Sequence, residues 1–248
     1  MTAPADAIQL SVLIPAFNEE KLLGRCLASV AAAAEALRPR GWRHEVIVCD
    51  NNSTDRTAEI ARANGALVVA EPVNQIARAR NRAAAAARGQ WLLFLDADSF
   101  PTPGLFDELA ATIASGECLG GGANVELENY AGRGRHLASL WNRLSRWTGW
   151  APGGFLFCEA AAFRQLGGFS DDLYVSEEIE FSRRLKRLAR ERGRRVVILR
   201  RHRLLTSARK LDLYSPAEFR RFVLRSVFSR GQTHRRREEC AIWYDGRR

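Results

Sequence analysis

The stretch Trp91–Ser99 reads Trp-Leu-Leu-Phe-Leu-Asp-Ala-Asp-Ser, an unbroken apolar run that ends in two carboxylates one residue apart. The apolar run is too short for most helices, and Pro101 and Pro103 follow it closely. This pattern predicts a strand that is buried on both faces of a sheet. The carboxyl end of such a strand lies at the edge where open parallel sheets bind their ligands.

Asp96 and Asp98 are spaced so that they can share one ligand. Side chains alternate along a strand, so residues two apart point the same way. Mg²⁺ takes oxygen ligands and is commonly shared between protein carboxylates and substrate phosphates. This D-x-D motif therefore predicts a Mg²⁺ or Mn²⁺ site, and the alternative is a pair of solvated aspartates that cap the next helix.

Strands and helices alternate on the amino-terminal side of this stretch. Apolar strands are predicted at 8–14, 44–49 and 66–70, and each is followed by a helical pattern. The first helix is expected to begin at Asn18, which is a good N-cap. Four strands alternating with helices predict a parallel sheet with right-handed crossovers. The dinucleotide fingerprint G-x-G-x-x-G does not follow the first strand, and the phosphate-binding loop G-x-x-x-x-G-K-[ST] does not occur. We therefore expect a metal ion and arginine side chains to bind phosphate.

Four motifs in this region carry a resemblance to a known family. They are SVLIPAFNEE at 11–20, VCDNNSTDRT at 48–57, ARNRAA at 79–84 and FLDADS at 94–99. In that order and near those spacings they resemble the nucleotide-binding half of family 2 glycosyltransferases. The segment 153–185, with its glycine-rich turn, its GGF and its acidic pair, resembles the acceptor half.

The resemblance implies an α/β protein of GT-A type, with a mostly parallel, Rossmann-like nucleotide-binding sheet flanked by helices. The GT-A domain would span residues 1–205, with a nucleotide-binding half at about 8–100 and an acceptor half at about 101–205. Residues 206–248 would form a basic helical extension.

The resemblance also assigns roles in the donor site. It implies that Pro15, Ala16 and Glu19 border the nucleotide, that Asp50 binds the base, and that Arg80 approaches the base or phosphates. Asp96 would lie near the ribose or the metal, and Asp98 would hold the cation on the diphosphate. His202 lies where some relatives have a histidine that completes the metal site, and the alternative is an ordinary surface histidine. Thr206, Ser207 and Arg209 are expected within reach of the diphosphate.

Glu177 and Glu178 match the acidic pair of the family, whose second member is the base. That pair is usually Glu-Asp, whereas the second member here is a glutamate. Ser176 is expected to cap a helix, which would place both carboxylates in its first turn, where the dipole favours their ionised form. The alternative is that the pair only stabilises the start of the helix. An aromatic stripe at 137–150 is expected to be core or to bind the acceptor sugar.

The charge of the chain is unevenly divided. The net charge is +10, but residues 183–248 hold 22 Lys and Arg against 6 Asp and Glu, whereas residues 1–182 hold 16 against 22. The basic third predicts contact with an anionic partner. Because no nucleic-acid motif is recognisable, we expect a lipid-linked or phosphorylated acceptor and peripheral membrane contact rather than nucleic acid.

Other features of the sequence restrict the class of protein. It contains no run of 18 apolar residues and no export signal at its amino terminus, so we expect a cytoplasmic protein. Its five cysteines lack C-x-x-C spacing, which argues against zinc and against a disulfide framework.

Together these patterns predict a metal-dependent glycosyltransferase that uses a nucleoside diphosphate sugar, with inversion as the usual outcome in the family. The alternatives are a nucleotidyltransferase, which would release pyrophosphate, and a non-catalytic basic module that binds a polyanion.

Overall fold

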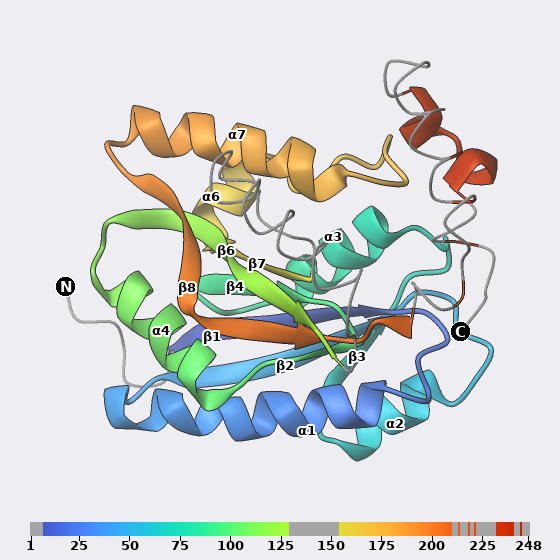
Figure 1. Cartoon of the computed structure of the whole chain (residues 1–248), viewed down its shortest axis with the longest axis horizontal. Helices are drawn as coiled ribbons and strands as arrows, with labels where there is room; N and C mark the ends of the chain where they lie inside the picture. The colour runs from blue at the N-terminus through green and yellow to red at the C-terminus, as the bar shows by residue number, and fades with distance from the viewer. Residues whose placement is uncertain are drawn as a thin grey trace.

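The computed structural model describes residues 7–128, 154–209 and 232–240, together with the single positions Leu213, Glu218, Arg221 and Tyr244. The described residues form an eight-stranded sheet in the order β3-β2-β1-β4-β7-β6-β8-β5. Helices cover both faces of this sheet (Figure 1). The arrangement is the three-layer α/β architecture that the alternating sequence pattern predicts.

The amino-terminal half of the sheet is parallel. It contains β1 (Ile8–Ala16), β2 (Arg43–Asp50), β3 (Leu67–Ala70) and β4 (Trp91–Leu95). Strand β1 lies between β2 and β4 and pairs with both in parallel, and β3 extends the sheet beyond β2. All five residues of β4 are buried, as its apolar run predicts. The carboxyl ends of β1, β2 and β4 therefore meet at one edge.

The other half of the sheet is mixed. Strand β7 (Phe155–Glu159) runs antiparallel to β4 and to β6 (Cys118–Leu127). Strand β8 (Arg195–Thr206) pairs in parallel with β6 and antiparallel with the short β5 (Ser99–Phe100). The far end of β8 reaches the residue after Asp98, because Thr206 pairs with Ser99.

Two helical layers enclose the core. One layer contains α1 (Leu23–Ala34), α2 (Thr57–Ala63) and α4 (Pro103–Ala114), and the other contains α3 (Ile76–Ala86), α6 (Ala160–Gln165) and α7 (Glu177–Glu191) (Figure 1). Three short 3-10 helices complete the described elements, η1 (Glu35–Arg40), η2 (Gln232–Arg235) and η3 (Arg237–Cys240). Each layer packs on its own buried apolar cluster. Burial of these two clusters holds the sheet edge that carries the site.

Two local predictions are wrong. Asn18 lies in a loop with φ of 52° and α1 begins only at Leu23, so Asn18 does not cap that helix. Ser176 lies at the start of α7 with φ of 67° and makes no capping hydrogen bond through its side chain. A Cβ added to Gly120 would lie 2.5 Å from the carbonyl oxygen of Phe157. This glycine therefore allows β6 to pack closely against β7 in the sheet.

Some predictions concern residues outside the described ranges. The aromatic stripe at 137–150 lies wholly outside them, as does most of the basic helix predicted from Ser215. Within the described residues, no helix is long and apolar enough to span a bilayer.

Candidate active site

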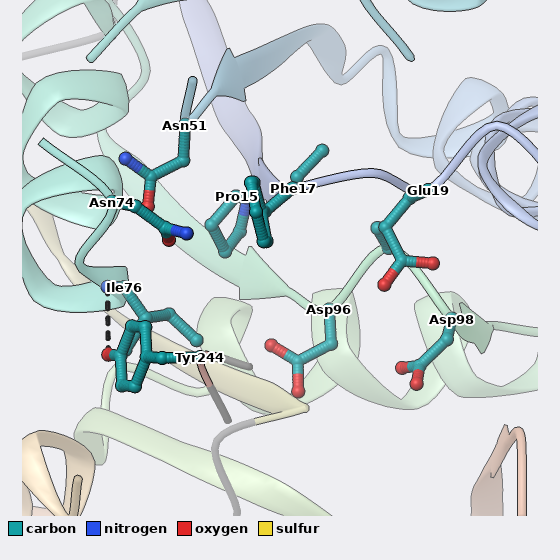
Figure 2. Close-up of a pocket in the computed structure, with 11 residues that line it drawn as sticks. Pro15, Phe17, Glu19, Asn51, Asn74, Ile76, Asp96, Asp98 and Tyr244 are labelled. Carbon is teal, nitrogen blue, oxygen red and sulfur yellow. Dashed lines mark hydrogen bonds between the residues drawn. The ribbon is translucent and has the colours of Figure 1, made fainter. Parts of the chain in front are cut away.

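A pocket lies at the carboxyl ends of β1 and β4 (Figure 2). Its lining combines acidic, amide and apolar side chains that come from distant parts of the chain. They are Pro15, Ala16, Phe17, Glu19, Asn51, Asn74, Ile76, Asp96, Ala97, Asp98 and Tyr244. The position agrees with the rule that open α/β sheets bind ligands beyond the carboxyl ends of their strands.

The loop that carries Glu19 is held by the loop after β2. The backbone N–H of Asn18 donates to Oγ of Ser53 at 3.0 Å, and that of Glu19 donates to Oγ1 of Thr57 at 2.8 Å. In return, Oδ1 of Asn18 accepts from the backbone N–H of Thr54 at 2.8 Å. These bonds occupy the polar groups of both loops, which fixes the Glu19 carboxylate at the rim of the pocket.

Asp96 and Asp98 lie in a turn between β4 and β5, because β4 ends at Leu95. The backbone N–H of Ser99 donates to the carbonyl of Asp96 at 3.1 Å and closes this turn. The backbone N–H of Ser207, just after β8, donates to the carbonyl of Asp98 at 2.9 Å. Both carboxylates line the pocket as predicted. The turn brings them together, rather than the alternation of side chains along a strand.

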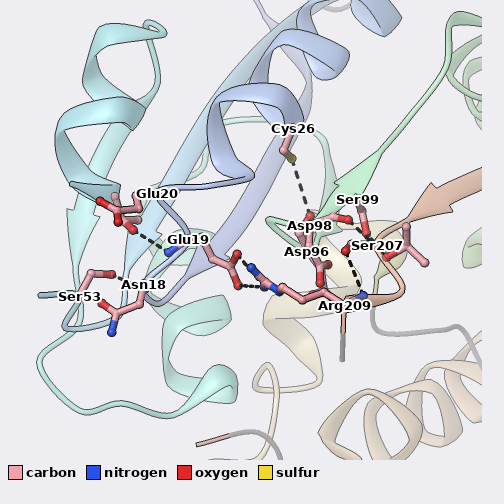
Figure 3. Close-up of polar contacts among 12 residues, drawn as sticks. Asn18, Glu19, Glu20, Cys26, Ser53, Asp96, Asp98, Ser99, Ser207 and Arg209 are labelled. Atoms are coloured by element: carbon pink, nitrogen blue, oxygen red, sulfur yellow. Dashed lines mark hydrogen bonds and ion pairs between the residues drawn. The ribbon is translucent and has the colours of Figure 1, made fainter. Parts of the chain in front are cut away.

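Arg209 closes one side of this group of carboxylates (Figure 3). Its Nη2 donates to both carboxylate oxygens of Glu19 at 2.9 Å. The Nε and Nη1 atoms of Arg209 are buried and have no hydrogen-bond partner. Buried N–H groups without an acceptor are unfavourable, so these two donors are suited to an anionic ligand.

Arg80 connects the pocket to α7. Its side chain is 2% exposed, and its two terminal nitrogens bind different carboxylates. Nη2 donates to Asp96 at 3.0 Å, and Nη1 donates to Glu177 at 2.6 Å. Arg80 is not among the pocket-lining residues, and its predicted approach to the base or phosphates stays a prediction. It lies behind Asp96 and holds that carboxylate from the protein side.

The acidic pair occupies the first turn of α7, as predicted. Glu177 is 2% exposed, whereas Glu178 is partly exposed. Burial and the neighbouring Glu178 raise the pKa of Glu177 to about 8, although Arg80 acts in the opposite direction. Burial also raises the pKa of Glu178. Glu180 faces elsewhere, because its carboxylate binds Arg184 at 2.6 Å on the same helix.

The remaining predicted residues lie beside the pocket or away from it. Asp50 is the last residue of β2 and lies opposite Ala16, and its Oδ1 accepts from the backbone N–H of Ser53 at 3.0 Å. His202 is exposed on β8, where its ring lies against Gly104. Its predicted place beside the metal is therefore wrong, because β8 delivers Thr206 and Ser207, not His202, to the Asp98 turn.

The described residues contain no group of three or more His, Cys, Asp and Glu side chains that could hold a metal ion. Asp96 and Asp98 nevertheless provide two carboxylates at one pocket. Mg²⁺ sites often use only one or two protein carboxylates and take further ligands from substrate phosphates and water. The two residues thus fit a cation that is shared with a substrate, and they do not form a closed structural metal site.

Six pocket residues have no role in the predicted site, namely Phe17, Asn51, Asn74, Ile76, Ala97 and Tyr244. Asn51 follows β2, and Asn74 and Ile76 lie at the start of α3, so the rule on strand ends could have found all three. Asn51 joins these loops, because its Oδ1 accepts from the backbone N–H of Gln75 at 2.9 Å. No local signal marks Tyr244, which comes from the far end of the chain.

The sequence matches the model of the family described as glycosyl transferase family 2 over residues 11–166. The chain belongs to that family. The matched region contains the pocket loops after β1 and β2, the Asp96 turn and the start of α3. The predicted family is thereby confirmed.

Curated relatives match family 2 regions of this chain over part of its length. The low-salt glycan biosynthesis hexosyltransferase Agl6 of Haloferax volcanii is 39% identical over 99 residues, which cover 40% of this chain and 23% of Agl6. The matches span less than half the length of the first curated relatives, at 26%, 23% and 46%.

Solved structures share the fold of this family 2 chain. Residues 1–349 of S. aureus TarS give a TM-score of 0.64 at 22% identity, and the match covers 82% of this chain and 61% of that one. Glucosyl-3-phosphoglycerate synthase from Mycobacterium tuberculosis gives 0.62 at 23% identity, with 90% and 78% covered. The predicted GT-A fold class is confirmed, and the basic carboxyl-terminal extension remains a prediction.

Proposed function

We propose that this chain transfers a sugar from a nucleoside diphosphate donor to a nucleophilic acceptor, with a divalent cation on the donor diphosphate. The bridge through Arg80 is the observation that carries the proposal. It joins Asp96 in the pocket to Glu177 in the acidic pair, at 3.0 and 2.6 Å. The buried guanidinium of Arg80 thus connects the carboxylates suited to the donor with those suited to the acceptor.

The donor is proposed to be a UDP-sugar. TarS has been crystallised with UDP-GlcNAc, and glucosyl-3-phosphoglycerate synthase with UDP and Mn²⁺. In this chain Asp98 and the pocket side of Asp96 would hold Mg²⁺ or Mn²⁺, which when bound neutralises charge on the leaving diphosphate. The two N–H donors of Arg209 that lack a partner would bind the same diphosphate.

The base is proposed to be Glu178. An acceptor hydroxyl loses its proton as it attacks the anomeric carbon, so an ionised carboxylate must lie within hydrogen-bond reach. Glu177 is buried and bound to Arg80, whereas the partly exposed Glu178 has access to an acceptor. Direct attack of the acceptor on the anomeric carbon would invert the configuration of the sugar.

Calorimetry with UDP tests the donor and metal roles together. UDP affinity should depend strongly on Mn²⁺ or Mg²⁺, and Asp98→Asn should remove most of that dependence. Asp107→Asn is the matched control, because Asp107 is 53% exposed and pairs with Arg40 on the surface. Equal UDP binding in chelator would exclude the metal role, and no UDP binding under any condition would argue against a UDP-sugar donor.

Product analysis tests the type of reaction. Turnover of a UDP-sugar should release UDP, which a coupled assay measures. Release of pyrophosphate from a nucleoside triphosphate and a sugar phosphate would instead identify a nucleotidyltransferase.

The acceptor is proposed to be lipid-linked or phosphorylated, on the basis of the charge division along the chain. Basic residues near an anionic leaflet contribute about 1 kcal/mol each. Vesicle flotation at low ionic strength should therefore show binding to anionic but not to neutral lipid. Equal flotation with anionic and neutral vesicles would contradict the proposal that a cytoplasmic protein binds the membrane surface through its basic residues.

A further inference from the structure

Tyr244, which lies near the carboxyl terminus in the sequence, lines the pocket. Its hydroxyl accepts from the backbone N–H of Ile76 at 3.3 Å (Figure 2). The same hydroxyl donates to the carbonyl of Tyr174 at 2.8 Å. The N–H of Ile76 belongs to the first turn of α3, where backbone donors have no partner inside the helix. Burial raises the pKa of Tyr244, so the neutral hydroxyl can both donate and accept.

The two ends of the pocket differ in their chemistry. Asp96, Asp98 and Glu19 lie at one end, whereas Asn74, Ile76 and Tyr244 lie at the other, with Pro15 between them (Figure 2). The first end suits a diphosphate with its cation. The second combines an aromatic ring and apolar surface with amide groups, which suits a flat base whose edges form hydrogen bonds.

We propose that the ring of Tyr244 forms the wall of the pocket against which the donor base rests. This inference depends on the proposed function, because it takes the ligand to be a nucleoside diphosphate. It adds a base-binding residue that lies outside the matched family region of 11–166. It also makes Tyr244, which lies near the carboxyl terminus in the sequence, part of the donor site.

His234 and Tyr244 also hold the loop that leads to the acidic pair Glu177 and Glu178. The backbone N–H of Tyr174 donates to the carbonyl of His234 at 2.7 Å, and the rings of Tyr174 and Tyr244 meet edge to face at 5.5 Å. From the pocket side, Nε2 of Gln75 donates to the carbonyls of Asp171 and Leu173 at 2.7 and 3.0 Å. The pocket wall that Tyr244 forms is therefore held by contacts with the loop just before Glu177, in addition to its contact with Ile76.

Binding measurements with UDP and with inorganic pyrophosphate separate the base from the diphosphate. Both ligands are titrated in excess Mn²⁺ into the full chain and its variants. Tyr244→Ala should weaken UDP binding by about tenfold or more, because stacking of a base on an aromatic ring has an effect of that size. Pyrophosphate binding should stay within about twofold of the original value.

Three further variants keep the experiment decisive. Tyr244→Phe retains the ring and should bind UDP within about twofold of the original chain, whereas Tyr244→Leu retains bulk and should resemble Tyr244→Ala. Leu serves if Ala does not fold, as judged by melting temperature. Val73→Ala is the control, because that side chain is 43% exposed and does not line the pocket.

The outcomes separate this inference from the proposed function. Failure of the original chain to bind UDP overturns the proposed UDP-sugar donor, and the inference falls with it. If the original chain binds UDP and Tyr244→Ala binds it equally well, only the inference is wrong. Equal weakening of UDP and pyrophosphate would also overturn it, because the ring would then act on the whole pocket.

Discussion

Arg80 and Arg209 each bind carboxylate groups at the site, but Arg80 joins two side chains, whereas Arg209 binds Glu19. Arg80 is 2% exposed and uses Nη1 and Nη2 on two different carboxylates. Arg209 is 16% exposed and uses one nitrogen for both oxygens of Glu19, while its Nε and Nη1 have no hydrogen-bond partner. The number of side chains that each guanidinium binds, rather than its charge, separates an arginine that joins two parts of the protein from one that binds a single carboxylate at the pocket rim.

Removal of Arg80 should have the largest effect on stability. Arg80→Met leaves Glu177 buried without its cation, so the free energy of unfolding should fall by about 3 kcal/mol or more. Arg78→Met on the same helix is the control, because Arg78 is 39% exposed and should cost about 1 kcal/mol or less. Urea denaturation measures both variants. Equal losses would show that the Arg80 bridge is no more important than a surface ion pair.

Glu178→Gln should have the largest effect on turnover. It keeps the size of the side chain but removes its basicity, so kcat should fall by about 100-fold or more while UDP affinity stays nearly unchanged. Glu177→Gln is the comparison, because it should weaken the Arg80 bridge and therefore lower stability. If Glu177→Gln instead lost turnover and Glu178→Gln stayed active, Glu177 would be the base. Full activity in both variants would show that the acidic pair only stabilises the start of the helix.

Arg209→Gln should act on ligand binding and much less on stability. Loss of its charged donors should weaken UDP binding by about tenfold in the presence of Mn²⁺, which calorimetry measures. Arg203→Gln is a matched control on β8, because Arg203 is 59% exposed and its nearest carboxylate is that of Glu126 at 3.6 Å. If Arg209→Gln destabilised the fold as much as Arg80→Met without weakening UDP binding, the contrast between the two arginines would be wrong.

The smallest expected effect is on pH dependence. The acidic pair titrates as a unit, and the pKa of Glu177 is raised to about 8, with burial as the largest cause. Burial also raises the pKa of Glu178, the proposed base, so turnover should rise with pH over a range in which an ordinary glutamate is already fully ionised. A pH profile of kcat tests this. A profile that is flat over this range would contradict a raised pKa in the working enzyme.

The same shift predicts a dependence of stability on pH. The folded chain holds the Glu177 proton to a higher pH than the unfolded chain does, so this contribution is complete below the ordinary pKa of 4.5. It is lost as the pH rises through about 8, and stability should fall over that interval. Glu177→Gln should reduce the slope, which melting curves at several pH values can measure.

The sequence was most informative where a local pattern and a general rule agreed. The apolar run Trp91–Leu95 predicted a fully buried strand, and the D-x-D after it predicted carboxylates at the edge of the sheet. Alternation of side chains along a strand does not explain why Asp96 and Asp98 converge, because β4 ends at Leu95 and Asp96 begins a turn. The order of motifs also predicted the family, since those motifs occupy the loops that surround the pocket.

Contacts between distant segments were beyond local patterns. The link from Arg80 to Glu177 joins residues 97 positions apart, and the link from Arg209 to Glu19 joins residues 190 positions apart. His202 illustrates the same limit in the opposite direction, because its place in the sequence suggested a metal ligand and the path of β8 leaves it exposed.

The sequence by itself determined the α/β class, the parallel strands at the amino terminus and the carboxylates at their ends. It could do so because burial and side-chain periodicity are local properties of a strand or a helix. Tertiary structure alone decided which arginine holds the acidic pair, which arginine binds Glu19, and that Tyr244 lines the pocket. Those outcomes depend on where the chain returns in space, and the sheet order and packing of the whole domain determine that path.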